Sequence, residues 1–250
     1  MQDSIECLRS VENQKREGFE LETIIVDNAS TDDSVEKIKA QFPQIHILIN
    51  SENFGFSEGN NIGVRYALKK KVDFVFILNN DTLLDKNCLL RLLQTAKKYD
   101  QGGIFGPKIY FSAGHEYHKD NYSSTQLGKV IWYAGGKIDW DNVLASHRGV
   151  DEVDQGQYDL LVKTSFVSGC AMFIRRAVFE RIGMFDQKLF LYYEDLDLCK
   201  RAQKAGFEIY YVPSSFMWHK NANSSGGSGS DLQSYYITRN RLLIGLRYAP

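Results

Sequence analysis

The chain has 250 residues, 43% of them apolar and 24% charged, with a net charge of −1. This length suits one α/β domain with a substantial core and is too short for two large domains. The near-neutral charge gives no electrostatic case for a nucleic-acid partner. None of the four cysteines has the short spacing of a zinc or redox motif. Together with the lack of an apolar targeting or membrane-spanning segment, buried free thiols predict a cytoplasmic protein.

The first half of the chain alternates between helix and strand patterns. Helices are expected at 4–14, 33–41, 58–70 and 85–99, because apolar residues recur there every three or four positions. Short apolar runs rich in β-branched residues predict strands at Thr23–Val26, Ile45–Ile49 and Phe74–Leu78. This order predicts a mainly parallel sheet with helices on both faces.

The second half is less regular. Residues 112–128 are polar and predict a surface excursion. Strands are expected at 129–133, 160–166, 170–174 and 208–212, the last of them stopped by Pro213. Helices are expected at 176–182, 194–205 and 232–247, and the Gly/Ser-rich segment 224–230 predicts a mobile loop.

Two carboxylates follow buried strands. Asp27 ends the first expected strand and Asp81 lies just past the third. Ligands of open parallel sheets bind beyond the carboxyl ends of the strands, so both acids are candidate site residues. Each is also suitable as a cap for the next helix. Two carboxylates near one crevice suit Mg²⁺ or Mn²⁺, which bind oxygen ligands together with substrate phosphates.

A second group of acids lies in Glu194, Asp195 and Asp197, at the start of an expected helix and after two tyrosines. Acids in a first helical turn favour the helix dipole, which explains one or two of them. We expect one of the three to act as a general base, which requires it to face the crevice. His219, beside Trp218, is either a hydrogen-bonded core residue or a ligand.

Five ordered motifs resemble those of the family-2 glycosyltransferases, which have the GT-A fold. They are Val26–Ser30, Asn53–Phe56 with Gly59–Asn61, Leu78–Thr82, Ser168–Gly169 and Phe190–Leu198. The resemblance covers nearly the whole chain and is strongest to the branch that includes bacterial rhamnosyltransferases. It implies one GT-A domain over 1–250, with a nucleotide-sugar-binding half at 1–110 and an acceptor and catalytic half at 111–250.

The resemblance also implies the activity and the role of each site residue. The expected reaction moves a sugar, with inversion, from a nucleotide-diphosphate donor to a hydroxyl of a glycan or lipid-linked acceptor in cell-surface polysaccharide synthesis. Asp195 matches the catalytic base, with Glu194 beside it; Asp81 matches the last acid of the metal motif, and His219 a position that ligates the divalent metal. The expected donor-binding residues are Asp27, Asn28, Asn53, Gly55, Asn60, Asn80 and Arg239, the last near the diphosphate.

The sequence departs from the family pattern twice. Asn79 replaces the leading acid of the metal motif, which predicts weaker metal binding or a metal shared with His219. The chain also starts directly with a helix, where the family begins with an apolar strand. That strand would lie between Thr23–Val26 and Phe74–Leu78, so its absence predicts a gap of about 10 Å in the sheet, two strand spacings of ~4.8 Å.

Other readings remain open at this point. A sugar nucleotidyltransferase would share the architecture and metal, but it needs a Gly-rich basic loop that is not visible. A non-catalytic or truncated nucleotide-sugar-binding fragment would account for the missing strand. Arg239, Arg241 and Arg247, with neighbouring leucines, are suited to peripheral contact with the inner face of the cell membrane, although an ordinary packed helix is the simpler reading.

Overall fold

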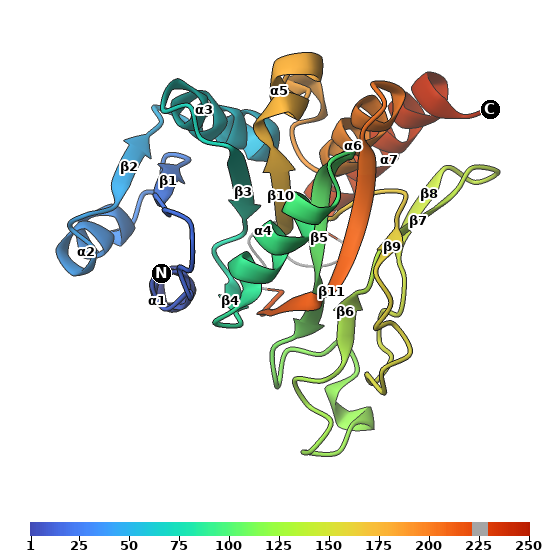
Figure 1. Cartoon of the computed structure of the whole chain (residues 1–250), viewed down its shortest axis with the longest axis horizontal. Helices are drawn as coiled ribbons and strands as arrows, with labels where there is room; N and C mark the ends of the chain where they lie inside the picture. The colour runs from blue at the N-terminus through green and yellow to red at the C-terminus, as the bar shows by residue number, and fades with distance from the viewer. Residues whose placement is uncertain (222–229) are drawn as a thin grey trace.

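The computed structural model describes residues 1–221 and 230–250, arranged as a large mixed sheet between helices, with a smaller lobe at the N-terminal end (Figure 1). The two chain ends lie on opposite sides of the molecule. The predicted mobile segment 224–230 lies outside the described residues except for Ser230. The Ser230 hydroxyl accepts a hydrogen bond from the N–H of Gln233 and so caps the last helix.

The N-terminal lobe has its own sheet and core. It contains α1 (Gln2–Glu12), β1 (Ile24–Asp27), α2 (Ser34–Gln41) and β2 (His46–Ile49), and β1 and β2 pair in parallel. Its core consists of four buried side chains: Ile5, Leu8, Ile38 and Phe42. The four elements lie close to their predicted positions, because their apolar periodicity matches their structure.

Helix α3 (Gly55–Lys69) joins the lobe to the main sheet, because it packs against both β1 and β3 (Phe74–Leu78). In the described part of the chain, β1 pairs only with β2 and β3 only with β10 (Ala171–Arg175). The interruption that the sequence predicts between β1 and β3 is therefore confirmed.

The main sheet has the order β3-β10-β5-β11-β4, with β6 paired to β5 and β9 to β11. Its other strands are β4 (Thr82–Leu84), β5 (Gly102–Phe111), β6 (Ile131–Tyr133), β9 (Val162–Lys163) and β11 (Glu208–His219). The α/β class is as predicted, but the strand directions differ from the expected mainly parallel sheet. Only β5 and β11 pair in parallel among these neighbours, because β10 and β4 run opposite to the strands beside them.

Two strand predictions were wrong. No strand was expected at 102–111, yet β5 lies at the centre of the sheet, and almost all of its residues are buried. Its glycines permit close packing, since a Cβ on Gly106 would lie 2.6 Å from Val167. Pro213 does not end β11, because a register shift between Val212 and Phe216 lets the strand continue to His219.

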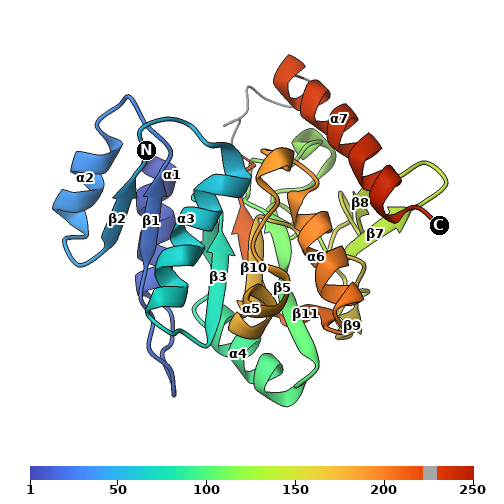
Figure 2. The ribbon, with the colours of Figure 1, turned by 90° about the horizontal axis from the view of Figure 1, so that it is seen from above.

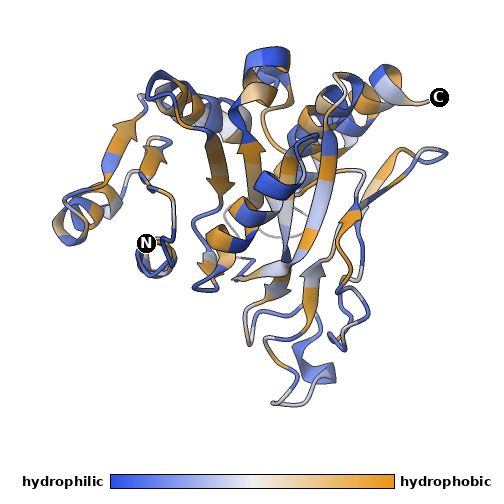
Figure 3. Ribbon diagram, viewed as in Figure 1, coloured by the Kyte–Doolittle hydropathy of each residue, from blue (hydrophilic) through white to orange (hydrophobic). Residues whose placement is uncertain are grey.

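The pleat of the sheet separates two cores. Along β3, Phe74, Phe76 and Leu78 face the core that lies under α4 (Cys88–Lys98), whereas Val75 and Ile77 face the opposite core. Successive strand residues point to opposite faces, so a strand apolar on both faces must be covered on both. Figure 3 shows β3 coloured hydrophobic along nearly its whole length.

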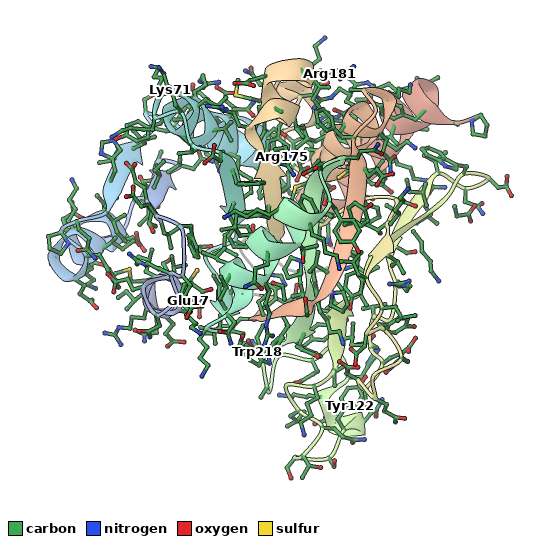
Figure 4. The ribbon with its side chains drawn as sticks, in the orientation of Figure 1. Glu17, Lys71, Tyr122, Arg175, Arg181 and Trp218 are labelled. Atoms are coloured by element: carbon green, nitrogen blue, oxygen red, sulfur yellow. The ribbon has the colours of Figure 1, made fainter. Side chains whose placement is uncertain are left out.

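The opposite core is covered by α3, α5 (Arg176–Ile182), α6 (Glu194–Lys204) and α7 (Asp231–Tyr248), which lie side by side in Figure 2. Helices α5, α6 and α7 begin or end within two residues of prediction. The excursion expected at 112–128 holds η1 (Lys119–Asn121), and the hairpin of β7 (Gly136–Asp139) and β8 (Leu144–His147), which was not predicted, follows β6. Figure 4 shows Tyr122 in this excursion, away from the sheet. A second short turn, η2 (Gln187–Leu189), precedes α6.

Candidate active site

Strand pairing brings Asp81 and His219 together from distant parts of the sequence. Asp81 immediately precedes β4, and β4 pairs with the end of β11 so that Thr82 lies opposite His219. The Nε2 atom of His219 lies 3.1 Å from Oδ1 of Asp81, and both side chains are buried. The carbonyl of Asp81 also accepts a hydrogen bond from the N–H of Lys220. The backbone therefore fixes this pair.

Asp195 lies in the first turn of α6, where two backbone N–H groups hold its carboxylate. Oδ2 accepts a 2.8 Å hydrogen bond from Gly169, and Oδ1 accepts one from Leu196. The side chain remains partly exposed. Burial raises the pKa of Asp195, and the two N–H donors act in the opposite direction. A raised pKa makes this carboxylate a better proton acceptor than an ordinary aspartate.

The segment Ser168–Cys170 connects the two groups of acids. Its Gly169 binds Asp195, while the carbonyl of Cys170 accepts a hydrogen bond from the N–H of Asn79, two residues before Asp81. Burial raises the pKa of the Cys170 thiol, and the negative charge of Asp81 raises it further. Asp195 and the residue two positions before Asp81 therefore contact the same short backbone segment, where β3 ends and β10 begins.

The two other acids of α6 have different environments. Glu194 is 5% exposed, and its Oε2 atom has no hydrogen-bond partner in the part of the chain that the structure describes. Burial, and next the charge of Asp195, raise the pKa of Glu194 well above the usual glutamate value. Asp197 is fully buried and accepts hydrogen bonds from Arg201, Arg247 and the hydroxyl of Tyr248. Asp197 therefore ties α7 to α6.

The backbone before α6 is strained. Phe190, Tyr192 and Tyr193 all have positive φ, with values of 61°, 67° and 68°. For bulky residues such conformations cost on the order of 1–3 kcal/mol each. Phe190, with ψ −61°, is the centre of a γ-turn closed by a hydrogen bond from Leu191 N to Leu189 O. This turn leads directly into Glu194 and Asp195.

Hydrogen bonds among the motif residues of the N-terminal lobe join the loop after β1 to the loop before α3. Both carboxylate oxygens of Asp27 accept from the N–H of Ser30, which forms a tight turn. Asn28 donates to the carbonyl of Gly55 and accepts from Asn50, and the Oδ1 atom of Asn53 accepts from the N–H of Gly55. Asp27 therefore caps a turn and not α2, which begins after Asp33.

Three further predicted donor-binding residues have other partners. Asn60 donates to Phe56 O within α3, and the exposed Asn80 donates to the hydroxyl of Ser4. Arg239 donates to the carbonyls of Lys188 and Leu189, and its guanidinium stacks on the Tyr236 ring at 4.7 Å. These contacts hold Arg239 against the turn before α6, and its expected contact with a diphosphate stays a prediction.

Asp81 and His219 carry an oxygen and a nitrogen atom of the kinds that bind divalent metals. Within residues 1–221 and 230–250, the buried Nδ1 atom of His219 has no hydrogen-bond partner, so no second structural bond of the imidazole is seen there. Among the described residues, no three His, Cys, Asp or Glu side chains form a metal-holding group. The pair therefore fits an ion that takes its remaining ligands from substrate phosphates and water, as Mg²⁺ and Mn²⁺ often do.

A pocket of about 550 Å³ lies apart from these residues. Its lining includes Tyr110, Phe216 and Trp218, whose rings pack against one another, and a buried Lys108 paired with Asp154 and Asp159. Trp218, labelled in Figure 4, precedes His219 on β11. Successive residues of a strand point to opposite faces of the sheet. The pocket thus opens on the other face from the Asp81–His219 pair.

Sequence reasoning missed two buried asparagines that shape the site. Asn240 donates from α7 to three carbonyls of the strained turn, and Asn61 exchanges hydrogen bonds with the backbone of Phe185. The available signal for Asn240 is its position between Ile237 and Ile244, on the apolar side of a helix.

Comparison with known proteins shows the family and the fold of the chain. A model of glycosyl transferase family 2 matches residues 5–183. The chain belongs to glycosyl transferase family 2. This family-2 chain is 24% identical over 211 residues to the N-acetylglucosaminyl-diphospho-decaprenol L-rhamnosyltransferase of Mycobacterium tuberculosis, a match that covers 81% of this chain and 67% of that protein. It is also 24% identical over 229 residues to the dTDP-rhamnosyl transferase RfbF of Shigella flexneri, covering 88% and 69% of the two chains.

The fold of the family-2 chain matches a solved structure over its full length. The mannosyltransferase PcManGT from Pyrobaculum calidifontis, solved with GDP-Man and Mn²⁺, superposes with a TM-score of 0.61 at 15% identity. The match covers 100% of this chain and 62% of that one. The predicted GT-A fold is confirmed. Among the described residues, no helix is both long and apolar enough to cross a membrane.

Proposed function

We propose that this family-2 chain is an inverting glycosyltransferase. It transfers a hexosyl or deoxyhexosyl group from a nucleotide-diphosphate donor to a hydroxyl of a glycan or lipid-linked acceptor in cell-surface polysaccharide synthesis. The observation that supports this most directly is that the Ser168–Cys170 segment contacts both Asp195 and Asn79, two residues before the Asp81–His219 pair. In the proposed site, Asp195 is the base, and the Asp81–His219 pair holds the metal that binds the diphosphate.

The proposed reaction is a single displacement. The acceptor oxygen forms a bond to the anomeric carbon as the bond to the diphosphate breaks, and the acceptor proton passes to the carboxylate of Asp195. The hydrogen bonds from Gly169 and Leu196 hold that carboxylate in one orientation. Orienting the base and the acceptor removes part of the entropic barrier to the reaction.

Asp81 and His219 would hold a divalent metal, which neutralises charge on the leaving diphosphate when it is bound. The turn formed by Asp27 and Asn28 would receive the nucleoside of the donor. The named relatives are rhamnosyltransferases, one of them named for dTDP-rhamnose. We therefore expect a dTDP-activated deoxyhexose as the first donor to test.

Contact with a lipid surface forms part of the proposal. Helix α7 buries Asn240 and Ile244 against the molecule, but Leu242 is 66% exposed and Leu246 is 87% exposed. Leu232 and Tyr235 continue this exposed stripe toward the start of the helix. An exposed apolar stripe on a helix that also carries Arg241 suits an anionic membrane bearing a lipid-linked acceptor. Binding there would bring such an acceptor near α6.

The activity is tested by nucleotide release with purified chain, a panel of dTDP-, UDP- and GDP-sugars, and Mn²⁺ or EDTA. We expect release of nucleoside diphosphate with at least one donor only when Mn²⁺ and an acceptor glycan are present. Release of pyrophosphate from a sugar phosphate and a nucleoside triphosphate would identify a nucleotidyltransferase instead. Absence of turnover and of any thermal shift with all donors would favour a non-catalytic module.

The lipid contact is tested by co-sedimentation with phosphatidylglycerol vesicles. The variant Leu242→Ser/Leu246→Ser is expected to lose binding. The matched control is Leu160→Ser, because Leu160 is a 79% exposed leucine outside α7. Equal binding by wild type and the double variant would exclude α7 as the contact.

A further inference from the structure

Asn240 lies at the centre of α7 with no exposed surface, and it faces the strained turn that precedes α6. Its Nδ2 group donates to the carbonyls of Leu189, Leu191 and Tyr192, at 2.8, 2.8 and 2.7 Å. A side-chain amide has two N–H bonds, so the three carbonyls share them. One side chain thus satisfies most of the acceptors of this turn.

The carbonyls that Asn240 binds belong to the part of the backbone that is least able to hold its shape alone. Leu189 and Leu191 flank the positive-φ residue Phe190, and Tyr192 itself has positive φ, as does Tyr193 after it. Such conformations persist only when surrounding contacts impose them. If the amide were lost, the turn would relax toward ordinary φ values, and Glu194 and Asp195 would move with it.

Residues at the start of α3, beside the proposed donor-binding residues, also contact this turn. The carbonyl of Phe190 accepts from the N–H of Ser57, and the Phe190 ring stacks on Tyr236 of α7 at 4.9 Å. A Cβ on Gly55 would lie 2.4 Å from that ring. The turn is thus packed between the start of α3 and α7, and Asn240 supplies the hydrogen bonds that the packing cannot.

We propose that Asn240 is a positioning residue for the catalytic carboxylate: from α7 it holds residues 189–193 in the conformation that presents Asp195. The inference rests on the proposed function, since it assigns Asn240 a role in the step for which Asp195 is the base. The amide is required because its donors face carbonyl oxygens. A carboxylate of the same shape would instead place oxygen against oxygen.

The test compares Asn240→Asp and Asn240→Ala with Gln14→Ala. Gln14 is a matched control because it is also buried and also binds three backbone groups, the carbonyls of Ser10 and Asp85 and the N–H of Leu89, far from α6. All three variants are expected to lower Tm similarly. The Asn240 variants should lower kcat about 10²-fold, the scale of a misplaced catalytic group, while changing the donor Kd much less. Gln14→Ala should keep kcat.

Hydrogen–deuterium exchange gives a readout that does not need turnover. Peptides covering 187–195 should exchange faster in both Asn240 variants and at the wild-type rate in Gln14→Ala. Unchanged exchange in this segment, or an equal kcat loss in Gln14→Ala, would overturn the assignment. If the wild type transferred no sugar at all, the proposed function would fail, and faster exchange would still establish that Asn240 holds the turn.

Discussion

The N–H of Gly169 donates a 2.8 Å hydrogen bond to Oδ2 of Asp195, and this contact joins α6 to the end of β10. A carboxylate fixed in this way is oriented before substrate arrives. We expect Asp195→Asn to lower kcat by about 10²–10⁴-fold, because the amide cannot accept the acceptor proton. The donor Kd, measured by calorimetry, should stay close to wild type. Wild-type turnover in this variant would contradict the assignment of the base.

Asp197→Asn should lower the free energy of unfolding, because Asp197 is fully buried and binds Arg201 and Arg247. Both arginines are partly exposed, so we expect a loss of about 2–4 kcal/mol, at or below the usual range for a broken buried pair. Denaturant unfolding measures this loss. Asp195→Asn, two residues away, is the comparison. If Asp197→Asn instead left stability unchanged and lowered kcat, Asp197 would have the catalytic role that we assign to Asp195.

Asp81→Asn should weaken metal binding. We expect the Mn²⁺ concentration for half-maximal turnover to rise at least about tenfold, since a carboxylate ligand is lost. The same shift should appear when Mn²⁺ binding in the presence of dTDP is followed by electron paramagnetic resonance. Asp85→Asn is the control, because Asp85 lies on the same segment but its carboxylate binds the N–H of Asn87. Identical Mn²⁺ dependence in both variants would remove Asp81 from the site.

The raised pKa of Glu194 predicts how stability changes with pH. Below the pKa of the unfolded chain, about 4.3, Glu194 is neutral in both states. As pH rises above that value, Glu194 ionises in the unfolded chain while it stays protonated in the folded chain. The free energy of unfolding therefore falls with rising pH until the pKa of Glu194 in the folded chain is passed. Glu194→Gln cannot ionise, so its Tm relative to wild type should be higher at pH 8 than at pH 5. An equal difference at both pH values would exclude the shift.

Gly59→Ala should weaken donor binding. A Cβ at Gly59 would lie 2.8 Å from the Nδ2 atom of Asn28, which donates to Gly55 O. We expect the donor Kd to rise about tenfold, equivalent to ~1.4 kcal/mol, by calorimetry. Gly63→Ala on the same helix is the matched control, because its Cβ meets a methyl of Val26 at 3.0 Å. Equal donor affinity in the two variants would separate Asn28 from the donor site.

The sequence predicted those features that depend on local patterns. The apolar run of β3, the acids at strand ends and the aromatic-acid segment before α6 are all visible in short windows. The pairing of Asp81 with His219 was implied by resemblance alone, because it depends on β4 lying beside β11. No local pattern of residues reports that contact.

The failures have one physical cause, which is that tertiary packing overrides local preference. Residues 102–111 contain Gly102, Gly103, Gly106 and Pro107, which read as a loop. They form the central strand, where residues without side chains allow neighbours such as Val167 to pack closely. The different environments of Asp195 and Asp197 could not be predicted from local pattern either, since they depend on Gly169 and Arg247 from other elements.

The separation of the N-terminal lobe from the main sheet has a consequence for ligand binding. A two-stranded sheet is marginally stable alone, and β1–β2 joins the main sheet mainly through α3 and the contacts of α1 with β4. A nucleotide sugar bound as proposed would touch Asp27 in this lobe and Asp81 in the main sheet. It would bridge two separate sheets, adding to the ion pairs that Lys220 already makes with Asp3 and Glu6 of α1.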